Sequence, residues 1–142
     1  MYRNPLYDEV LNIFSRQFKI PTRNSKNKTL QKGMTAAFRK IVLDERTEKS
    51  SIIYQEKLLV SIEIYGPENY IKKTDTDNFA KFILDAFKGI VYKDDKQIYC
   101  LVVNKIIGQW HGVRIGIKPL ADDKFPLHPH LPLLGNDDLW TN

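Results

Sequence analysis

Large apolar side chains recur every three or four positions between Thr76 and Lys88, and a glycine, Gly89, follows directly. This spacing places them on one face of an α-helix, and a glycine is typical of the position where a helix ends. The segment is therefore predicted to be an amphipathic helix, Thr76 to Lys88, that packs its apolar face against a core. The apolar positions are Phe79, Phe82, Ile83, Ala86 and Phe87.

Strand patterns flank this helix on both sides. Leu58 to Tyr65 alternates apolar and polar residues and ends at Gly66-Pro67, which is typical of a strand followed by a turn. Ile98 to Ile107 and Val113 to Ile117 predict two more strands, joined by a turn around Gly108 to Gly112. These strands would supply the sheet against which the helix packs.

The first third of the chain is more ambiguous. Asn4-Pro5, followed by Asp8-Glu9, favours a helix start, whereas Ile13 to Ile20 alternates like a strand that ends at Pro21. We expect a short helix followed by that strand. Thr22 to Lys32 is predicted to be a basic loop, and Gly33 to Asp44 a second helix.

A chain of 142 residues has the length of one domain. We predict a single α+β domain over residues 1–118, with a mixed sheet of about four strands packed with two main helices. Residues 119–142 contain four acidic side chains, one lysine and several prolines, which exclude a regular helix or a central strand. This acidic tail is either disordered or an extended arm, and its leucines and Trp140 favour the arm.

Composition narrows the class of protein. The formal net charge of +5 favours a polyanionic partner, although moderate basicity alone does not establish one. Cys100 is the only cysteine, which excludes an intrachain disulfide and a cysteine-rich zinc site and indicates a reducing, cytoplasmic location. It lies in the apolar stretch Ile98 to Val103, which we expect to be a buried strand. No stretch of 18 apolar residues is present, so no membrane partner is expected.

The polar face of the predicted Thr76–Lys88 helix carries an unusual concentration of charge. Asp75 and Asp77 lie at its start, and Lys81 follows one turn later. One interpretation is structural: Asp favours helix N-caps and the positive end of the helix dipole, and Asp77 with Lys81 is an ordinary i,i+4 pair. A second acidic pair, Asp94-Asp95, argues for more, since the chain can return there beside the helix start.

Converging carboxylates repel one another unless a cation lies between them. Oxygen ligands of this kind suit Mg²⁺, with Mn²⁺ as a substitute, and such a site also binds phosphate oxygens. A metal held in this way can promote hydrolysis of a phosphodiester, with Lys81 offsetting the charge that develops on the phosphate.

The ordered run Asp75-x-Asp77-Asn78-x-x-Lys81, then Leu84-Asp85, Gly89 and Asp94-Asp95-x-Gln97, resembles the signature of the RusA family of Holliday junction resolvases, the crossover junction endodeoxyribonucleases. Two weaker matches, Pro21-x-x-Asn24 and Lys105, extend the resemblance to about Ile20 to Ile117.

The resemblance implies a homodimeric, Mg²⁺-dependent endodeoxyribonuclease that resolves four-way DNA junctions by paired symmetric nicks. It implies that Asp75, Asp77 and Asp95 are the metal-binding and catalytic carboxylates and that Asp94 is a further metal ligand. Lys81 would be the catalytic lysine. The neighbouring residues Asn78, Asp85 and Gln97 are assigned to structure around the site.

DNA binding would fall to basic and amide side chains outside the acidic motif, most of them acting on phosphates. Two other interpretations remain open. One is a non-catalytic DNA-junction-binding protein on the same scaffold, and the other is a protein whose aspartates are only helix caps and surface charges. The predicted DNA-binding residues are Arg23, Asn24, Lys26, Lys28, Lys32, Arg39, Lys40, Lys72, Lys73 and Lys105.

Overall fold

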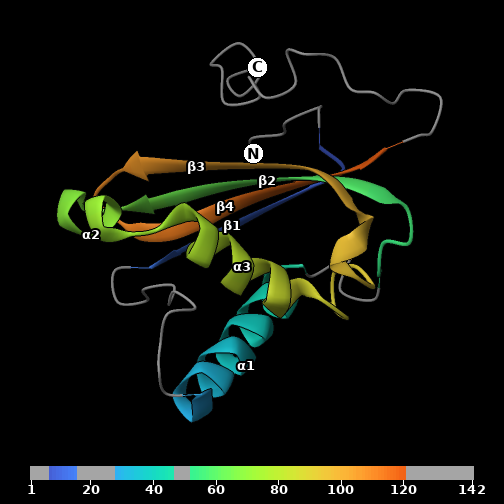
Figure 1. Ribbon diagram of the computed structural model, residues 1–142, viewed down its shortest axis with the longest axis horizontal. Coiled ribbons are helices and arrows are strands. Elements are labelled where there is room, and N and C mark those ends of the chain that lie inside the picture. Colours follow the sequence, from blue (N-terminus) through green and yellow to red (C-terminus); the bar gives the residue numbers. More distant parts are fainter. Residues whose placement is uncertain (1–6, 16–27, 47–51, 121–142) are drawn as a thin grey trace.

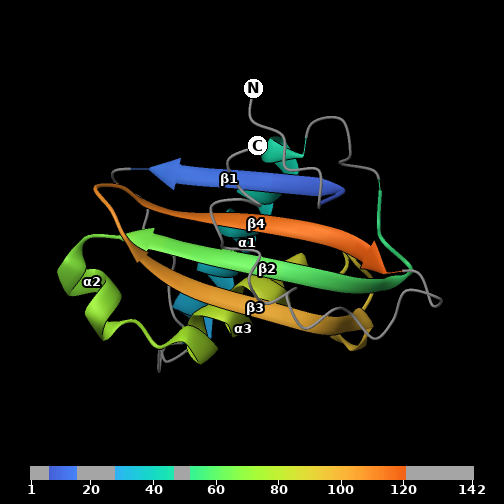
Figure 2. The same cartoon turned by 90° about the horizontal axis from the view of Figure 1, so that it is seen from above.

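A computed structural model of the chain describes residues 7–15, 28–46 and 52–120. Its four strands form one sheet in the order β1-β4-β2-β3 (Figures 1 and 2). β4 pairs antiparallel with both β1 and β2, whereas β2 and β3 run parallel, so the sheet is mixed. The strands are β1 (Glu9–Ser15), β2 (Lys57–Gly66), β3 (Ile98–Ile107) and β4 (His111–Leu120).

The helices of the described residues are α1 (Lys28–Glu45), α2 (Glu68–Lys73) and α3 (Thr76–Phe87), and a 3₁₀ turn, η1 (Asp95–Gln97), precedes β3. α1 and α3 lie against the same face of the sheet, and α2 lies beside its end (Figure 1). The prediction of a single α+β domain with a four-stranded mixed sheet is confirmed. None of the described helices is long and apolar enough to cross a membrane.

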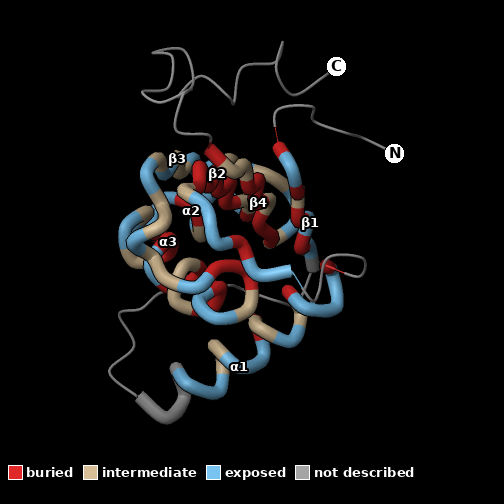
Figure 3. The backbone as a smooth tube through the Cα atoms, turned by 90° about the vertical axis from the view of Figure 1, so that its right-hand side faces the viewer, coloured by how far each residue is buried: buried red, intermediate tan, exposed pale blue. Residues whose placement is uncertain are grey.

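The core lies between the sheet and the two long helices (Figure 3). Alternate residues of β2 point into it, and the apolar face predicted for the Thr76–Lys88 helix is completely buried in α3. Phe38 of α1 packs against Phe82 and Phe87 of α3, with ring centroids 5.7 and 6.4 Å away. Burial of each such ring contributes about 1.5–3 kcal/mol. The amphipathic pattern therefore correctly predicted a helix, α3, that packs its apolar face against the core.

The start of the described chain differs from the prediction. A short helix starting at Asn4-Pro5 and running past Asp8-Glu9 was expected, but Glu9 is the first residue of β1, so the helix is wrong there, and residues 1–6 lie outside the described residues. Glu9 is buried, and its carboxylate accepts a 2.8 Å hydrogen bond from Nε of the buried Arg46 at the end of α1. Glu9, Leu11 and Ile13 are alternate buried residues of β1. Because glutamate is normally a surface residue, the sequence alone does not show that Glu9 belongs to this buried series. Residues 16–20 of the predicted strand lie outside the described residues.

Two helical segments were assigned to loops. α1 begins at Lys28 and not at Gly33, so the last residues of the predicted basic loop form its first turn. α2 occupies the segment expected only to connect a strand to a helix. It begins after Pro67, whose φ of −60° suits a helix entry, and it buries Ile71. The two predicted main helices are thus present as α1 and α3, and α2 is a short helix that was not expected.

β3 has the predicted bounds but a different environment. It is an edge strand, with Tyr99, Leu101 and Ile107 52%, 42% and 60% exposed, so the expectation of a buried strand with a core thiol is wrong. Cys100 is only partly buried. β4 extends to Leu120, beyond the predicted end of the strand. The expected arm lies outside the described residues from residue 121 onward.

Candidate active site

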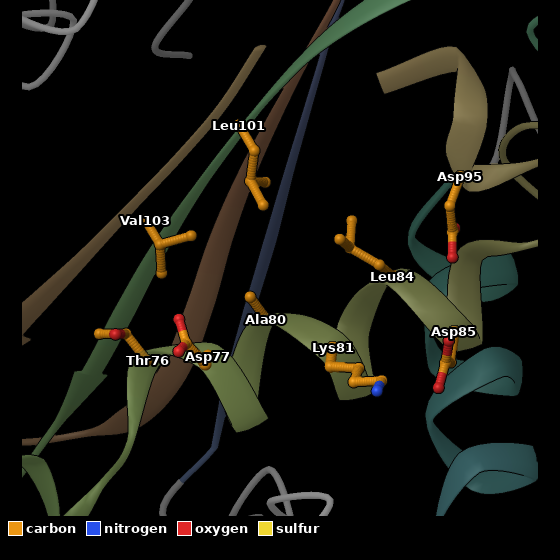
Figure 4. A pocket seen from close by; sticks show the side chains of 9 residues that line it. All are labelled: Thr76, Asp77, Ala80, Lys81, Leu84, Asp85, Asp95, Leu101 and Val103. Carbon is orange, nitrogen blue, oxygen red and sulfur yellow. The ribbon is translucent and has the colours of Figure 1, made fainter. Parts of the chain in front are cut away.

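The acidic motif lies on one connection between neighbouring parallel strands. The chain leaves β2 at Gly66, forms α2 and α3, and returns through η1 to β3, which pairs with β2 (Figure 1). The first acidic segment therefore lies at the start of α3 and the second lies just before β3. Because β2 and β3 run parallel, the crossover returns to the end of the sheet where β2 begins. Asp95 therefore lies near the end of α3, where Tyr92 links it to Leu84, and the expected return beside the start of this helix is wrong (Figure 4).

A pocket of about 240 Å³ lies between α3 and β3 (Figure 4). Asp77, Lys81 and Asp85 contribute its polar side from α3, and Asp95 of η1 faces it from the other acidic segment. Asp77 and Asp95 lie at opposite ends of the pocket (Figure 4). The apolar remainder consists of Ala80, Leu84, Leu101 and Val103, and Thr76 completes the lining. Of the predicted catalytic residues, the structure thus places Asp77, Lys81 and Asp95 around one pocket.

Asp75 has the capping role that the sequence offered as an alternative. It is the N-cap of α3, and its Oδ1 accepts a 3.0 Å hydrogen bond from the backbone N–H of Asp77. Its Oδ2 accepts a longer one, 3.4 Å, from Nδ2 of Asn78. An N-cap of this kind contributes about 1 kcal/mol to helix stability. Asp75 is exposed and does not line the pocket.

Asp94 and Gln97 form a capping box on η1. The backbone N–H of Lys96 donates to Oδ1 of Asp94 at 3.1 Å, and this hydrogen bond lowers the pKa of the Asp94 carboxyl. Asp94 does not line the pocket. Its carboxylate therefore shapes the turn that carries Asp95.

The Gln97 amide uses all of its usual hydrogen-bonding groups. Its Oε1 accepts from the backbone N–H groups of Lys93 and Asp94, both at 2.8 Å. Its Nε2 donates to the carbonyl oxygens of Tyr54 and Glu56, at 2.8 and 3.0 Å. The amide thereby ties the acidic turn to the segment that enters β2, as expected of a structural residue.

Tyr92 does not line the pocket, but it connects two residues that do, Leu84 and Asp95. Its hydroxyl lies 2.7 Å from the carbonyl oxygen of Leu84 and 2.8 Å from Oδ1 of Asp95. Burial, together with the Asp95 carboxylate, raises the pKa of Tyr92, so the hydroxyl keeps its proton at neutral pH. Tyr92 is not part of the acidic motif, and nothing in the sequence indicates its role, because it follows the apolar residues Ile90 and Val91 in a short hydrophobic connection.

The predicted DNA-binding residues fall into different environments. Arg23, Asn24 and Lys26 lie outside the described residues, as does the side chain of Lys28. Lys32, Lys40, Lys72 and Lys73 are exposed on helices, and Lys72 pairs with Glu68 at 3.0 Å. Arg39 donates to the carbonyl oxygen of Lys88 at 3.3 Å. These positions are compatible with phosphate contacts.

Lys105 is held by two backbone carbonyl oxygens. Its Nζ donates to the carbonyl oxygens of Ile71 and Thr74, both at 3.0 Å. These carbonyls lie at the end of α2 and directly before Asp75. The Lys105 ammonium therefore holds the entry to α3.

The carboxylates do not form a ready-made metal centre. Among residues 7–15, 28–46 and 52–120, no three His, Cys, Asp or Glu side chains are placed to hold one metal ion. The four predicted ligands, Asp75, Asp77, Asp94 and Asp95, are thus not gathered around a single point. Mg²⁺, however, commonly binds through one or two carboxylates and keeps several waters. Asp77 and Asp95 each offer the oxygen donors that Mg²⁺ prefers, but they lie at opposite ends of the pocket, and the described residues form no closed site of three or more carboxylates.

Comparison with known proteins assigns the chain to a family. A search of curated proteins found no match. A family model described as Endodeoxyribonuclease RusA matches residues 15–118, which include both acidic segments and every residue that lines the pocket. Because this match covers well over half of the chain, the protein belongs to the RusA endodeoxyribonuclease family.

Proposed function

We propose that this protein is a Mg²⁺-dependent endodeoxyribonuclease that resolves four-way DNA junctions by paired symmetric nicks, as a homodimer. The observation that carries the proposal is the meeting of Asp77, Lys81 and Asp95 around one pocket in a chain of the RusA family. Resolution of Holliday junctions is the activity that membership of this family implies. The fold alone would not suggest it, because function resides in the site.

Asp77 and Asp95 are the proposed principal metal-binding carboxylates. When bound there, Mg²⁺ would supply Lewis acidity to the phosphoryl group and make water a better nucleophile. Lys81, on the turn of α3 after Asp77, donates to the scissile phosphate and offsets its developing negative charge. Asp75 remains a proposed ligand, because each carboxylate oxygen has a second lone pair beside its capping hydrogen bond. Asp94 is proposed as a ligand on the same ground.

DNA binding relies on exposed basic side chains outside the pocket. Lys72 and Lys73 end α2, next to the start of α3, and Lys32 lies on α1. Contacts of this kind bind phosphates without reading sequence and make affinity depend strongly on salt. Two symmetric nicks require two sites related by a two-fold axis, which supports the proposed homodimer.

The alternative is a junction-binding protein without catalysis. It would share the basic side chains and the fold. The pocket argues against it, because Asp77, Asp85 and Asp95 would repel phosphate at the centre of a pure binding surface. A Lys81 ammonium within the same pocket is better explained by phosphoryl-transfer chemistry.

The deciding experiment compares cleavage of a labelled synthetic four-way junction with that of linear duplex of the same sequence, in Mg²⁺ and in EDTA. We expect paired, Mg²⁺-dependent nicks in the junction alone. Asp77→Asn should abolish cleavage and keep or tighten junction binding, because it removes negative charge that faces phosphate. Asp44→Asn, an exposed acid on α1 outside the pocket, is the matched control and should cleave normally.

Each result separates the two candidates. Junction binding by the wild-type protein without cleavage in Mg²⁺ or Mn²⁺ would favour the non-catalytic protein. Cleavage by Asp77→Asn at the wild-type rate would exclude the assigned pocket while leaving the nuclease activity intact.

A further inference from the structure

Tyr92 lies outside the acidic motif yet contacts it. Its ring is completely buried and packs edge-on against Phe87, with centroids 6.4 Å apart. The residue follows α3 by a few positions, and its hydroxyl reaches both Leu84 on that helix and Asp95 on η1. One buried side chain therefore joins the two elements that carry the candidate catalytic carboxylates.

The Tyr92 hydroxyl has one proton to donate, and the other hydrogen bonds of its two acceptors indicate which of them receives it. The carbonyl oxygen of Leu84 also accepts the backbone N–H of Lys88, at 3.2 Å, so it is satisfied without Tyr92. Oδ1 of Asp95 has no other hydrogen-bond donor among the described residues, so it depends on the Tyr92 hydroxyl. The proton therefore belongs on the Asp95 side of the pair.

This hydrogen bond leaves Asp95 with one oxygen fixed and one available. Oδ1 is occupied by Tyr92 at 2.8 Å, and the side chain projects into the pocket (Figure 4). Among the described residues, Oδ2 receives no hydrogen bond. A ligand whose second polar atom is held by a protein partner keeps its orientation and its basicity, which is why such partners strongly affect metal affinity.

We propose that Tyr92 is a positioning residue that holds the Asp95 carboxylate in the orientation needed to bind the metal ion. The proposal rests on the proposed function in taking Asp95 as a metal-binding carboxylate. What it adds is that the Tyr92 hydroxyl, which does not itself line the pocket, sets how tightly the metal binds.

Tyr92→Phe removes that oxygen and keeps the buried ring. Tyr54→Phe is a matched control, because Tyr54 is also a buried tyrosine whose hydroxyl contacts carboxylates, Asp8 at 2.6 Å and Glu9 at 3.1 Å. Neither of those acids lines the pocket. Both variants lose a buried tyrosine–carboxylate hydrogen bond, and only one of them loses it at Asp95.

The first measurement is Mn²⁺ binding to the DNA-free protein, followed by electron paramagnetic resonance. We expect Tyr92→Phe to weaken binding about 10- to 100-fold and Tyr54→Phe to leave it unchanged. The second is the Mg²⁺ concentration that gives half-maximal junction cleavage. It should rise for Tyr92→Phe, and saturating Mg²⁺ should restore most of the rate.

The outcomes distinguish this proposal from the function itself. Equal Mn²⁺ affinity in the wild type and in Tyr92→Phe would overturn the proposal, as would a wild-type protein that binds no Mn²⁺. Equal losses in both tyrosine variants would also overturn it, since the effect would then be general destabilisation. A protein that binds Mn²⁺ in the expected order and cuts no junction would refute the proposed function and leave the role of Tyr92 supported.

Discussion

The Lys105 ammonium lies 3.0 Å from the carbonyl oxygen of Thr74, the residue directly before Asp75. It reaches the Ile71 carbonyl oxygen at the same distance. An ammonium has three N–H donors, and two of them are thus directed at backbone. The basic residue that the sequence suggested as a DNA contact therefore joins β3 to the entry of α3.

Lys105→Met should lower the cleavage rate and leave the salt dependence of junction binding unchanged, because it disturbs α3 without removing a phosphate contact. Lys72→Met, at an exposed position on α2, is the comparison. If Lys72 contacts phosphate, its removal should reduce the slope of log affinity against log salt by about 1. Binding titrations over a range of roughly 50 to 200 mM salt measure the slope for both variants. A reduced slope for Lys105→Met would restore its role as a DNA contact.

Lys81→Ala should depress the cleavage rate by about 100-fold or more, because it removes a donor aimed at developing charge. Junction affinity should change far less. Single-turnover cleavage at saturating protein separates the two effects. Lys88→Ala, which removes an exposed ammonium at the end of the same helix but outside the pocket, should cleave normally. A defect in Lys81→Ala that disappears at saturating protein would make Lys81 a DNA contact.

Arg46→Met should destabilise the fold by about 3–5 kcal/mol, because it leaves the buried Glu9 carboxylate without its partner. It also removes hydrogen bonds to the carbonyl oxygens of Ile90, at 2.6 Å, and Ile52, at 2.9 Å. Equilibrium denaturation in urea provides the free energy of unfolding. Lys40→Met, at an exposed position on the same helix, should stay within about 0.5 kcal/mol of the wild type. Equal decreases in the free energy of unfolding for the two variants would show that the buried Arg46–Glu9 pair does not contribute specifically to stability.

Gln97→Glu should loosen the acidic turn at neutral pH. A carboxylate still accepts from Lys93 and Asp94 but cannot donate to Tyr54 and Glu56, whose carbonyl oxygens it would repel. Hydrogen exchange of residues 93–97 should therefore accelerate, and cleavage should slow. Gln55→Glu, at an exposed amide in the segment before β2, is the control.

The Gln97→Glu variant also has a pH test. The carbonyl oxygens of Tyr54 and Glu56 favour the protonated form of the introduced carboxyl group, which raises its pKa in the fold above the usual value of about 4.3. The destabilisation should then be greatest at neutral pH and shrink as the pH falls through that raised pKa. A loss of stability relative to the wild type that is independent of pH would contradict this account of the amide.

The sequence predicted those helices and strands whose formation depends on residues within the same segment. α3 begins at the predicted Thr76, since its apolar spacing, its N-cap and its terminal glycine all lie within the segment. Gly89 adopts a φ of +86°, a conformation that other residues rarely accept, which explains the helix end. The motif residues Asp77, Lys81 and Asp95 all line the pocket, because they lie on one connection between neighbouring strands, but Asp77 and Asp95 occupy its opposite ends.

Features that depend on distant partners were not predictable in this way. Glu9 reads as a surface acid until Arg46 is placed beside it, and the sheet order depends on pairings that periodicity does not encode. Tyr92 and the apolar wall of Leu101 and Val103 resemble core residues in the sequence. Leu101 and Val103 line the pocket because β3 lies at the edge of the sheet, and the sequence does not encode that position.

The edge position of β3 also has a dynamic consequence. Within the described residues, β3 pairs with β2 alone, whereas β2 and β4 are each paired on both sides. Strands bonded along one side open locally at lower free-energy cost than central strands, so the amides of β3 should exchange with solvent before those of β2. Leu101 and Val103, which line the pocket, belong to β3 and move when it does. The pocket is thus bounded on one side by a helix anchored in the core and on the other by an edge strand, which opens more readily than the central strands, so its width can change while the core stays folded.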